Sequence, residues 1–360
     1  MSFENRYSTL DRLLHKLAFA TSSIQVAVAD MEDQFFASQL EPIEIHRPVF
    51  VTALPRAGTT LLLEAIEALP EFASHTYRNM PFVLCPLLWN RFSSGFRRSG
   101  EAQERAHQDG MLVTADSPEA FEEMLWKAFW KRHYEKDRIR PWEESDTEFF
   151  EFLRSHMRKI VALSDPKTDA MPRYLSKNNL NIARVGILAE NFPDAAIVVP
   201  FREPLQHAAS LLRQHKNFLD IHKEDRFARE YMAGIGHFDF GENLRPVDFN
   251  AWLDRATAAE PTTIGFWLEY WIATYSHLAD QDGIHLVCYE DLCAAPVDAL
   301  QHLARILQLQ DPAALLNVAS RIEARQPHAV TTDSAIQGLV DQSHDLYQRL
   351  RSRAGGQSAE

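Results

Sequence analysis

The sequence has few cysteines, no long apolar run and no excess of basic residues. Its 360 residues include only three cysteines, Cys85, Cys288 and Cys293, and none of them belongs to a C-x-x-C pair. We therefore expect neither a disulfide framework nor a cysteine zinc site, and a reducing compartment is the simplest interpretation. An apolar stretch of about 18 residues, as a transmembrane helix needs, is absent, so we expect no membrane span.

Two further absences narrow the class of protein. Asp11, Arg12 and Lys16 interrupt the apolar residues near the N-terminus, so a signal peptide is not expected and we predict a cytoplasmic protein. The net charge is −13, whereas a nucleic-acid binder usually carries a basic face. We expect no nucleic-acid partner, although a local cluster of arginines can still bind an anion against this background.

Apolar runs of strand length alternate with segments of helical periodicity along the chain, which is typical of an α/β fold. We predict a central parallel sheet of about four to five strands with helices on both faces. The predicted strands are 49–54, 173–177, 195–201 and 284–288, and the clearest helices are 8–20, 61–69, 204–217 and 262–281. One domain is expected over 1–360, with a helical extension at 1–47, a helical insertion at 80–165 and a flexible tail at 352–360.

The first motif is the loop Pro55-Arg56-Ala57-Gly58-Thr59-Thr60, between a predicted strand and a predicted helix. In this position backbone N–H groups and the helix N-terminus point at one spot, which favours an anion. Gly58 lets the backbone approach the ligand closely, Arg56 adds positive charge, and Thr59 and Thr60 add hydroxyl donors. An ordinary strand–turn–helix connection is the structural alternative.

This loop differs from the triphosphate loop G-x-x-x-x-G-K-[ST] at two positions. Ala53 stands where the first glycine belongs, and Thr59 stands where the lysine belongs. The loop therefore has the groups for one phosphate but lacks the lysine that reaches the β- and γ-phosphates.

The second motif follows the apolar strand that ends at Phe201. Arg202 lies at the carboxyl end of that strand, where ligands bind in open α/β sheets, and Ser210 lies eight residues further on a predicted helix. A guanidinium and a hydroxyl that converge on one phosphate suit a phosphomonoester. The structural alternative is an ion pair between Arg202 and Glu203.

Together the two motifs, in this order, resemble the phosphate-binding elements of the sulfotransferase family, in particular its bacterial and tyrosyl-protein branches. The resemblance covers roughly residues 48–77, 173–217 and 284–296, and includes Tyr289-Glu290-Asp291-Leu292, for which we predict a structural role. Family members often have serine where this chain has Ala57. The resemblance implies a P-loop-like three-layer fold and the donor 3′-phosphoadenosine 5′-phosphosulfate, without a metal. The loop would bind its 5′-phosphate, and Arg202 with Ser210 its 3′-phosphate.

The resemblance also implies roles for residues near the transferred group. Arg56 would stabilise the leaving 5′-phosphate, and Lys177, at the end of a predicted strand, matches a family lysine that contacts the bridging oxygen or the sulfonate. Relatives use a glutamate base at a position that is Tyr77 here. We predict His75 as the substitute base, because its ordinary pKa suits proton transfer near neutral pH, and Tyr77 and Arg78 as acceptor contacts.

The remaining alternatives concern the base and the class of protein. Glu122, Asp116 and His133 are more remote candidates for the base. The acceptor is a small molecule or a glycan or peptide, and we expect its pocket in the aromatic-rich segment 80–165, although packing in the core also explains those aromatic residues. A magnesium-dependent nucleotide kinase and a non-catalytic nucleotide-binding protein are the alternative functions. The oligomeric state has no signature in the sequence.

Overall fold

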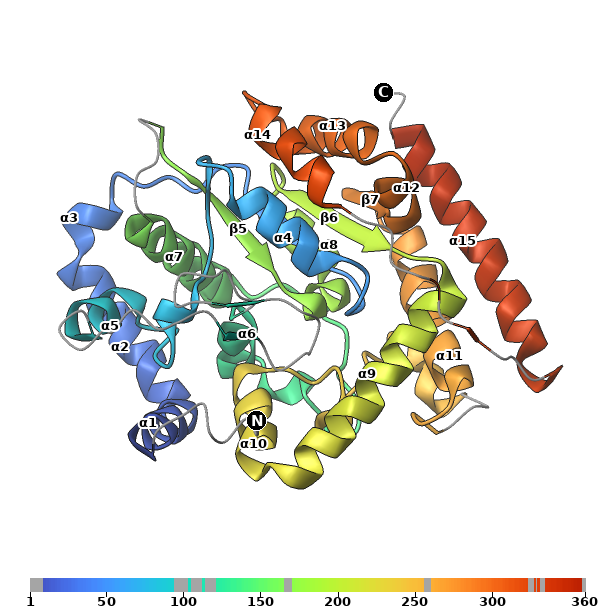
Figure 1. The fold of residues 1–360 in the computed structure, drawn as a ribbon. Helices are drawn as coiled ribbons and strands as arrows, with labels where there is room; N and C mark the ends of the chain where they lie inside the picture. The colour runs from blue at the N-terminus through green and yellow to red at the C-terminus, as the bar shows by residue number, and fades with distance from the viewer. Residues whose placement is uncertain are drawn as a thin grey trace.

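A parallel sheet of five strands forms the centre of the fold (Figure 1), as the sequence predicted. The computed structural model describes residues 9–93, 103–104, 112–113, 121–164, 170–255, 260–322, 327, 329–330 and 334–357. The strand order is β2-β5-β1-β6-β7, and Val51 of β1 lies opposite Lys177 of β5 and Val198 of β6. The strands are β1 (Val49–Val51), β2 (Phe72–Ala73), β5 (Arg173–Lys177), β6 (Ala196–Phe201) and β7 (Ile284–Cys288).

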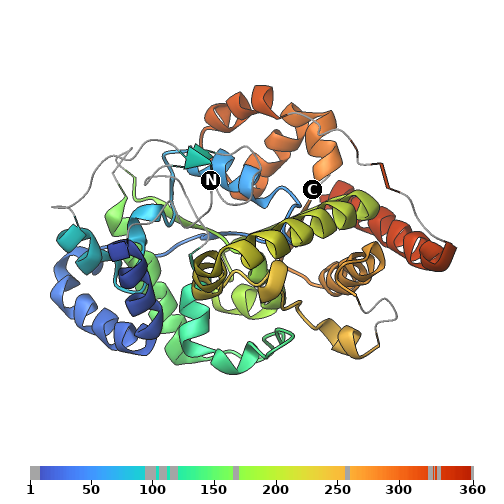
Figure 2. The same ribbon diagram turned by 60° about the horizontal axis from the view of Figure 1, so that its bottom comes forward.

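Both faces of this sheet are covered, so the fold has three layers (Figure 2). Val49 and Val51 pack into one apolar core, and Phe50 between them packs into the other, as the period of two in a strand requires. The first core contains α4 (Thr59–Glu67), α12 (Tyr289–Ala294), α13 (Pro296–Leu307) and α14 (Ala313–Leu316). The second contains α6 (Glu123–Phe129), α7 (Thr147–Leu163), α8 (Val185–Asn191), α9 (Pro204–Glu224), α10 (Arg226–Ile235), α11 (Ile264–Ala279) and α15 (Gln337–Gln357).

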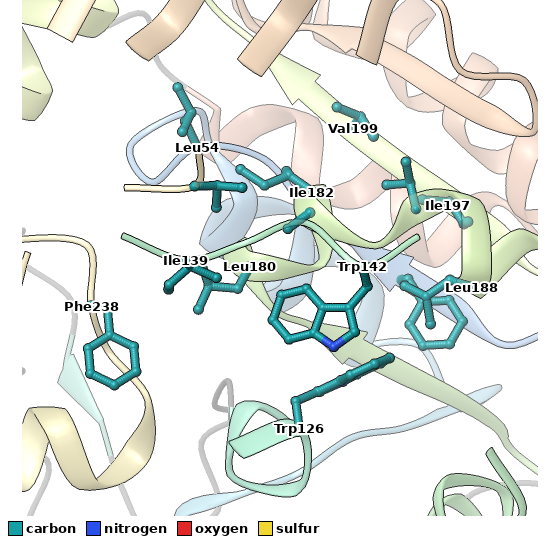
Figure 3. Packing of buried hydrophobic residues seen from close by; sticks show 14 of the residues in the cluster. Leu54, Trp126, Ile139, Trp142, Leu180, Ile182, Leu188, Ile197, Val199 and Phe238 are labelled. Atoms are coloured by element: carbon teal, nitrogen blue, oxygen red, sulfur yellow. The ribbon is translucent and has the colours of Figure 1, made fainter. Parts of the chain in front are cut away.

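The second core is rich in aromatic residues from the predicted insertion (Figure 3). Trp126 is fully buried, and Trp142 lies next to it, with 5.9 Å between the ring centroids. The guanidinium of Arg184 lies 4.1 Å from the ring centre of Trp126 and 4.3 Å from that of Trp142. These aromatic side chains therefore build the core and hold the turn that follows β5.

Helices form most of the described residues before β1 and between residues 80 and 165. The N-terminal helices are α1 (Thr9–Ala20), α2 (Ser22–Phe35) and α3 (Ala37–Leu40), and α5 (Pro86–Ser93) precedes α6 and α7 in the insertion. A short antiparallel pair, β3 (Gln103–Glu104) and β4 (Leu112–Val113), also lies in the insertion. Buried Lys159 of α7 lies 3.0 Å from the Glu32 carboxylate, which ties α2 to α7.

The prediction of a flexible tail at 352–360 is wrong for residues 352–357, because α15 continues to Gln357. Leu350 and Ala354 are buried against the second core, and Arg353 donates hydrogen bonds to the carbonyls of Leu278 and Ala279 at the end of α11. These contacts hold the last turns of the helix, and residues 358–360 lie outside the described part. No helix in the described ranges is long and apolar enough to cross a membrane.

Candidate anion-binding site

The candidate site lies at the carboxyl edge of the sheet, where the parallel strands end together. The loop Pro55–Thr60 follows β1, Lys177 ends β5, Arg202 follows β6 and Tyr289 follows β7. The sheet order places β1 between β5 and β6, so residues more than 100 positions apart in the sequence converge beside the loop. In open α/β sheets this edge is the usual place for a ligand.

The loop has a conformation that its sequence explains. Gly58 has φ of 101°, in the left-handed region, and a Cβ atom there would lie 3.2 Å from Cδ2 of Tyr289. Glycine is therefore needed both for the turn and for the close approach of Tyr289. Arg56 also has a positive φ, 72°, and Ala57 is completely buried. α4 begins at Thr59 without a side-chain cap on its first turn, so its first N–H groups face the loop.

Arg202 lies directly against this loop. Its Nη1 donates a hydrogen bond to the Arg56 carbonyl oxygen at 3.3 Å, and its guanidinium stacks 4.5 Å from the ring centre of Tyr289. The buried Nε of Arg202 has no hydrogen-bond partner among the described residues. Glu203 accepts hydrogen bonds from the N–H groups of Leu205 and Gln206 at the start of α9, so it acts as a helix cap instead of an ion-pair partner for Arg202.

His207 of α9 contacts the loop from inside the fold. Its Nε2 lies 2.8 Å from the Pro55 carbonyl oxygen, and the ring is fully buried. Burial lowers the pKa of His207 to about 3, and the charges of Arg202 and Arg56 contribute to the same shift. Burial therefore keeps the ring neutral at pH 7, and its contact with Pro55 ties α9 to the loop. Ser210 lies one turn further along α9 and is 2% exposed.

A buried network fixes the turn after β5 next to the loop. Thr52 Oγ1 donates to the Asn179 carbonyl oxygen at 3.1 Å, and Thr59 Oγ1 donates to Asn179 Oδ1 at 3.3 Å. Asn178 donates to the Glu123 carboxylate at 2.7 Å, and Arg184 forms an ion pair with the same carboxylate at 2.5 Å. This network positions the end of β5, and with it half-buried Lys177, beside the end of β1.

The structure places His75 in the core rather than at an open site. His75 is 2% exposed, its Nε2 lies 2.8 Å from Nε2 of His156 in α7, and its ring stands edge-on to Tyr174. Burial lowers the pKa of His75 to about 4. A general base must reach the proton that it removes, so this placement supports a structural role and gives no support to the predicted catalytic one.

Of the other predicted candidates for the base, Glu122 lies in the core and His133 is half-buried. Glu122 is 1% exposed and accepts hydrogen bonds from Tyr174, Asn181 and Trp126, so it belongs to the buried network. His133 stacks on Trp142 with 4.4 Å between ring centroids. Asp116 lies outside the described residues.

The two predicted acceptor contacts follow β2, the edge strand beside β5. Both belong to a short 3-10 helix, Tyr77–Asn79, whose start is held by a hydrogen bond from the Thr76 N–H to Asn79 Oδ1 at 2.8 Å. Tyr77 is half-buried, with its ring edge-on to Phe121, and Arg78 is exposed. Their position past the carboxyl end of a strand puts them at the same edge of the sheet as the loop.

Sequence reasoning missed three side chains at this edge. Asn179, His237 and Asp239 contact one another in series beside Thr59. The ring of Tyr289, for which a structural role was predicted, covers Gly58. Asn179 could have been suspected, because it follows a strand end directly. His237 and Asp239 lie in an irregular segment after α10, and no sequence pattern marks them.

No group of three or more His, Cys, Asp or Glu side chains that could hold a metal ion occurs within the described part of the chain. The three cysteines are free thiols. The groups at the loop are the Arg202 guanidinium, the Thr59 hydroxyl and backbone N–H groups, which suit an oxyanion.

Comparisons with known proteins identify the family. Residues 48–237, more than half of the chain, match the model of the sulfotransferase family. No curated protein matches the chain. Among solved structures, a sulfotransferase from Mycobacterium avium is 13% identical, with 90% of this chain and 81% of that chain covered and a TM-score of 0.45. A sulfotransferase from Mycobacterium tuberculosis is 15% identical, with 89% and 80% covered and a TM-score of 0.44.

Proposed function

Because the chain belongs to the sulfotransferase family, we propose that it transfers a sulfuryl group from 3′-phosphoadenosine 5′-phosphosulfate to a hydroxyl or amine acceptor. The observation that carries this proposal is the contact of Arg202 with the loop that precedes the uncapped start of α4, with the buried Nε of Arg202 lacking a partner among the described residues. These groups fit an anionic nucleotide with more than one phosphate.

In the proposed complex each phosphate has its own set of side chains. The N–H groups of the loop Pro55–Thr60, with Arg56 and the hydroxyls of Thr59 and Thr60, bind the 5′-phosphate. Arg202 and Ser210 bind the 3′-phosphate. The Tyr289 ring contacts both Gly58 and the Arg202 guanidinium, and these contacts keep the loop and the guanidinium in place.

The proposed chemistry is an in-line displacement at sulfur. The acceptor oxygen or nitrogen forms the new bond to sulfur, and the bond between sulfur and the 5′-phosphate breaks with its electron pair going to the phosphate. Arg56 and the N–H groups of the loop stabilise the negative charge that develops there, and Lys177 stabilises the sulfonate oxygens. The protein acts mainly by positioning and charge neutralisation, and this mechanism uses no metal.

The acceptor belongs to the class of small molecules, glycans or peptides, and Tyr77 and Arg78 are its proposed contacts. Both follow β2 at the carboxyl edge of the sheet, and Arg78 is exposed, which supports a role at the entrance of the acceptor pocket. The insertion 80–165 begins directly after them and would form the other wall of the acceptor pocket. The three free cysteines support a reducing, cytoplasmic location for the enzyme.

A thermal-shift titration with 3′,5′-adenosine bisphosphate tests donor binding. A ligand at about 100 times its Kd stabilises the folded state by about 2.7 kcal/mol, which is easily measured. Arg202→Gln should remove most of this stabilisation, since a charge-assisted hydrogen bond contributes about 1.5–3 kcal/mol. Arg213→Gln, an exposed arginine on the same helix, is the matched control and should behave like the wild type.

Two outcomes would favour the alternative functions. Stabilisation by magnesium-ATP with no response to the bisphosphate would indicate a nucleotide kinase. Binding of the bisphosphate without transfer of labelled sulfur to a broad panel of acceptors or to water would indicate a non-catalytic nucleotide-binding protein.

A further inference from the structure

The segment that follows α10 brings two titratable side chains to the anion-binding loop. Gly236 ends α10 with φ of 87°, and the N–H of His237 donates to the Met232 carbonyl oxygen at 2.8 Å. A Cβ atom on Gly236 would lie 2.4 Å from Cγ of Glu123, so the segment packs tightly against α6. This close packing fixes the path of the chain from Gly236 to Asp239.

Asp239 is linked to the loop through Asn179. Its Oδ2 accepts a hydrogen bond from Asn179 Nδ2 at 3.3 Å, and Asn179 Oδ1 accepts one from Thr59 at 3.3 Å. Because Thr59 is the first residue of α4, only the Asn179 side chain separates the carboxylate from the helix N-terminus where the donor is proposed to bind. Asp239 therefore lies close to the group that is transferred.

His237 holds the Asp239 carboxylate from the other side. Its Nε2 lies 3.4 Å from Asp239 Oδ2, and the two side chains are 18% and 11% exposed. The imidazole ring stacks on Phe218 of α9, with 5.7 Å between centroids. Asn179 and His237 thus both contact Oδ2, and Oδ1 accepts no hydrogen bond from the described residues.

From this arrangement we propose that Asp239 is the general base of the transfer reaction and that His237 is its positioning residue. The proposal rests on the proposed function. As the acceptor oxygen bonds to sulfur, its O–H bond breaks and the proton goes to the Asp239 carboxylate. The electron pair of the broken sulfur–oxygen bond goes to the 5′-phosphate, and Asp239 later releases its proton to water.

The other buried acids near the loop do not offer such a group. The Glu123 carboxylate binds Arg184, Asn178 and Tyr134. The Glu122 carboxylate accepts hydrogen bonds from Tyr174, Asn181 and Trp126. Both carboxylates are almost fully buried, at 3% and 1% exposure. Asp239 is partly exposed and has an oxygen left for the acceptor, which is what a base requires.

The decisive experiment compares acceptors of different acidity in Asp239→Asn. The assay follows transfer of labelled sulfur from the donor to benzyl alcohol, to 4-nitrophenol and to water. Benzyl alcohol must lose its proton during the reaction, whereas 4-nitrophenol is already substantially ionised near neutral pH. We expect kcat for benzyl alcohol and water to fall about 10²- to 10⁴-fold, with a much smaller change for 4-nitrophenol.

Two controls separate loss of the base from loss of structure. Asp239→Asn should bind 3′,5′-adenosine bisphosphate with the wild-type affinity and unfold at a similar temperature, because the amide keeps the size of the carboxylate. Asp282→Asn changes an exposed aspartate and should keep wild-type rates for all acceptors. Asp239→Glu should recover part of the lost activity.

His237 needs a readout that a purely structural role would not change. In His237→Ala the Asp239 carboxylate loses the ring that holds it, so kcat for benzyl alcohol should fall by up to about 10²-fold, with a much smaller change for 4-nitrophenol. A purely structural defect would lower both rates equally. Tyr270→Phe changes a buried ring of α11 and should leave both rates at the wild-type level.

The outcomes distinguish the assignment of Asp239 as the base from the proposed sulfuryl transfer on which it rests. Equal losses for all acceptors in Asp239→Asn, or wild-type rates for all of them, would overturn the assignment of Asp239 while leaving sulfuryl transfer intact. Equal changes for benzyl alcohol and 4-nitrophenol in His237→Ala, or wild-type rates for both, would overturn the role of His237. A wild-type protein that transfers sulfur to none of the acceptors and not to water would overturn both the proposed function and the assigned base.

Discussion

Replacing His75 by phenylalanine should weaken the protein at neutral pH but make it less sensitive to acid. His75 and His156 are both buried, their rings stack with 5.1 Å between centroids, and one Nε2 donates to the other at 2.8 Å. His75→Phe fills most of the same space but leaves Nε2 of His156 without its partner. A buried polar group that loses its partner costs about 1–3 kcal/mol, so the free energy of unfolding at pH 7 should fall by about that much.

Acid should destabilise the wild type more than the His75→Phe variant. Burial lowers the pKa of His75 from 6.5 to about 4. Between these values the unfolded chain binds a proton that the folded protein does not, so the wild type loses stability as the pH falls through this window. One such group contributes about 1.4 kcal/mol per pH unit and about 3 kcal/mol over the whole window. Without His75 this contribution disappears, and the stabilities of variant and wild type should approach each other as the pH falls to 4.

Urea unfolding followed by tryptophan fluorescence at pH 7, 6 and 5 measures this difference. His344→Phe, at an exposed histidine on α15, should leave the dependence on pH unchanged. An unchanged slope in His75→Phe would refute the burial of a neutral His75. A loss of kcat by about 10²-fold or more at pH 7, with normal binding of the bisphosphate, would instead support His75 as the catalytic base.

Three other substitutions test contacts in the loop, in the buried network beside it and at the C-terminal helix. Gly58→Ala should reduce the affinity for 3′,5′-adenosine bisphosphate and lower the free energy of unfolding by at least about 1–2 kcal/mol, because φ is 101° and Tyr289 lies 3.2 Å from the new Cβ. Calorimetry measures the affinity, and thermal unfolding measures the stability. Arg184→Leu leaves the buried Glu123 carboxylate without its ion-pair partner and should cost about 3–5 kcal/mol in urea unfolding. Arg353→Gln removes hydrogen bonds to the end of α11 and should lower the free energy of unfolding by about 1–3 kcal/mol without changing transfer rates. A change in kcat would contradict a purely structural role for α15.

Local sequence predicted most of the sheet and the positions of the loop and of Arg202 at its carboxyl edge. β5 and β7 have the predicted bounds, and β1 and β6 lie within the predicted runs, because buried parallel strands require continuous apolar segments. β2 was not predicted, since two residues are too short to carry a period. The positions of the loop and of Arg202 follow from the order of strand, turn and helix, which is a property of neighbouring residues.

The contacts between distant segments were decided only by the tertiary structure. His75 is buried because α7 brings His156, 81 positions away, against it, and its exposure and pKa depend on that packing. Asp239 reaches Asn179 across 60 positions and, through it, Thr59 across a further 120. The sequence by itself determined which segments become most of the strands and helices, and it placed the loop Pro55–Thr60 between a strand and a helix. The sheet order and the packing of α6, α7 and α10 decided which titratable side chains lie in the core and which face the site, because burial and proximity depend on segments far apart in the chain.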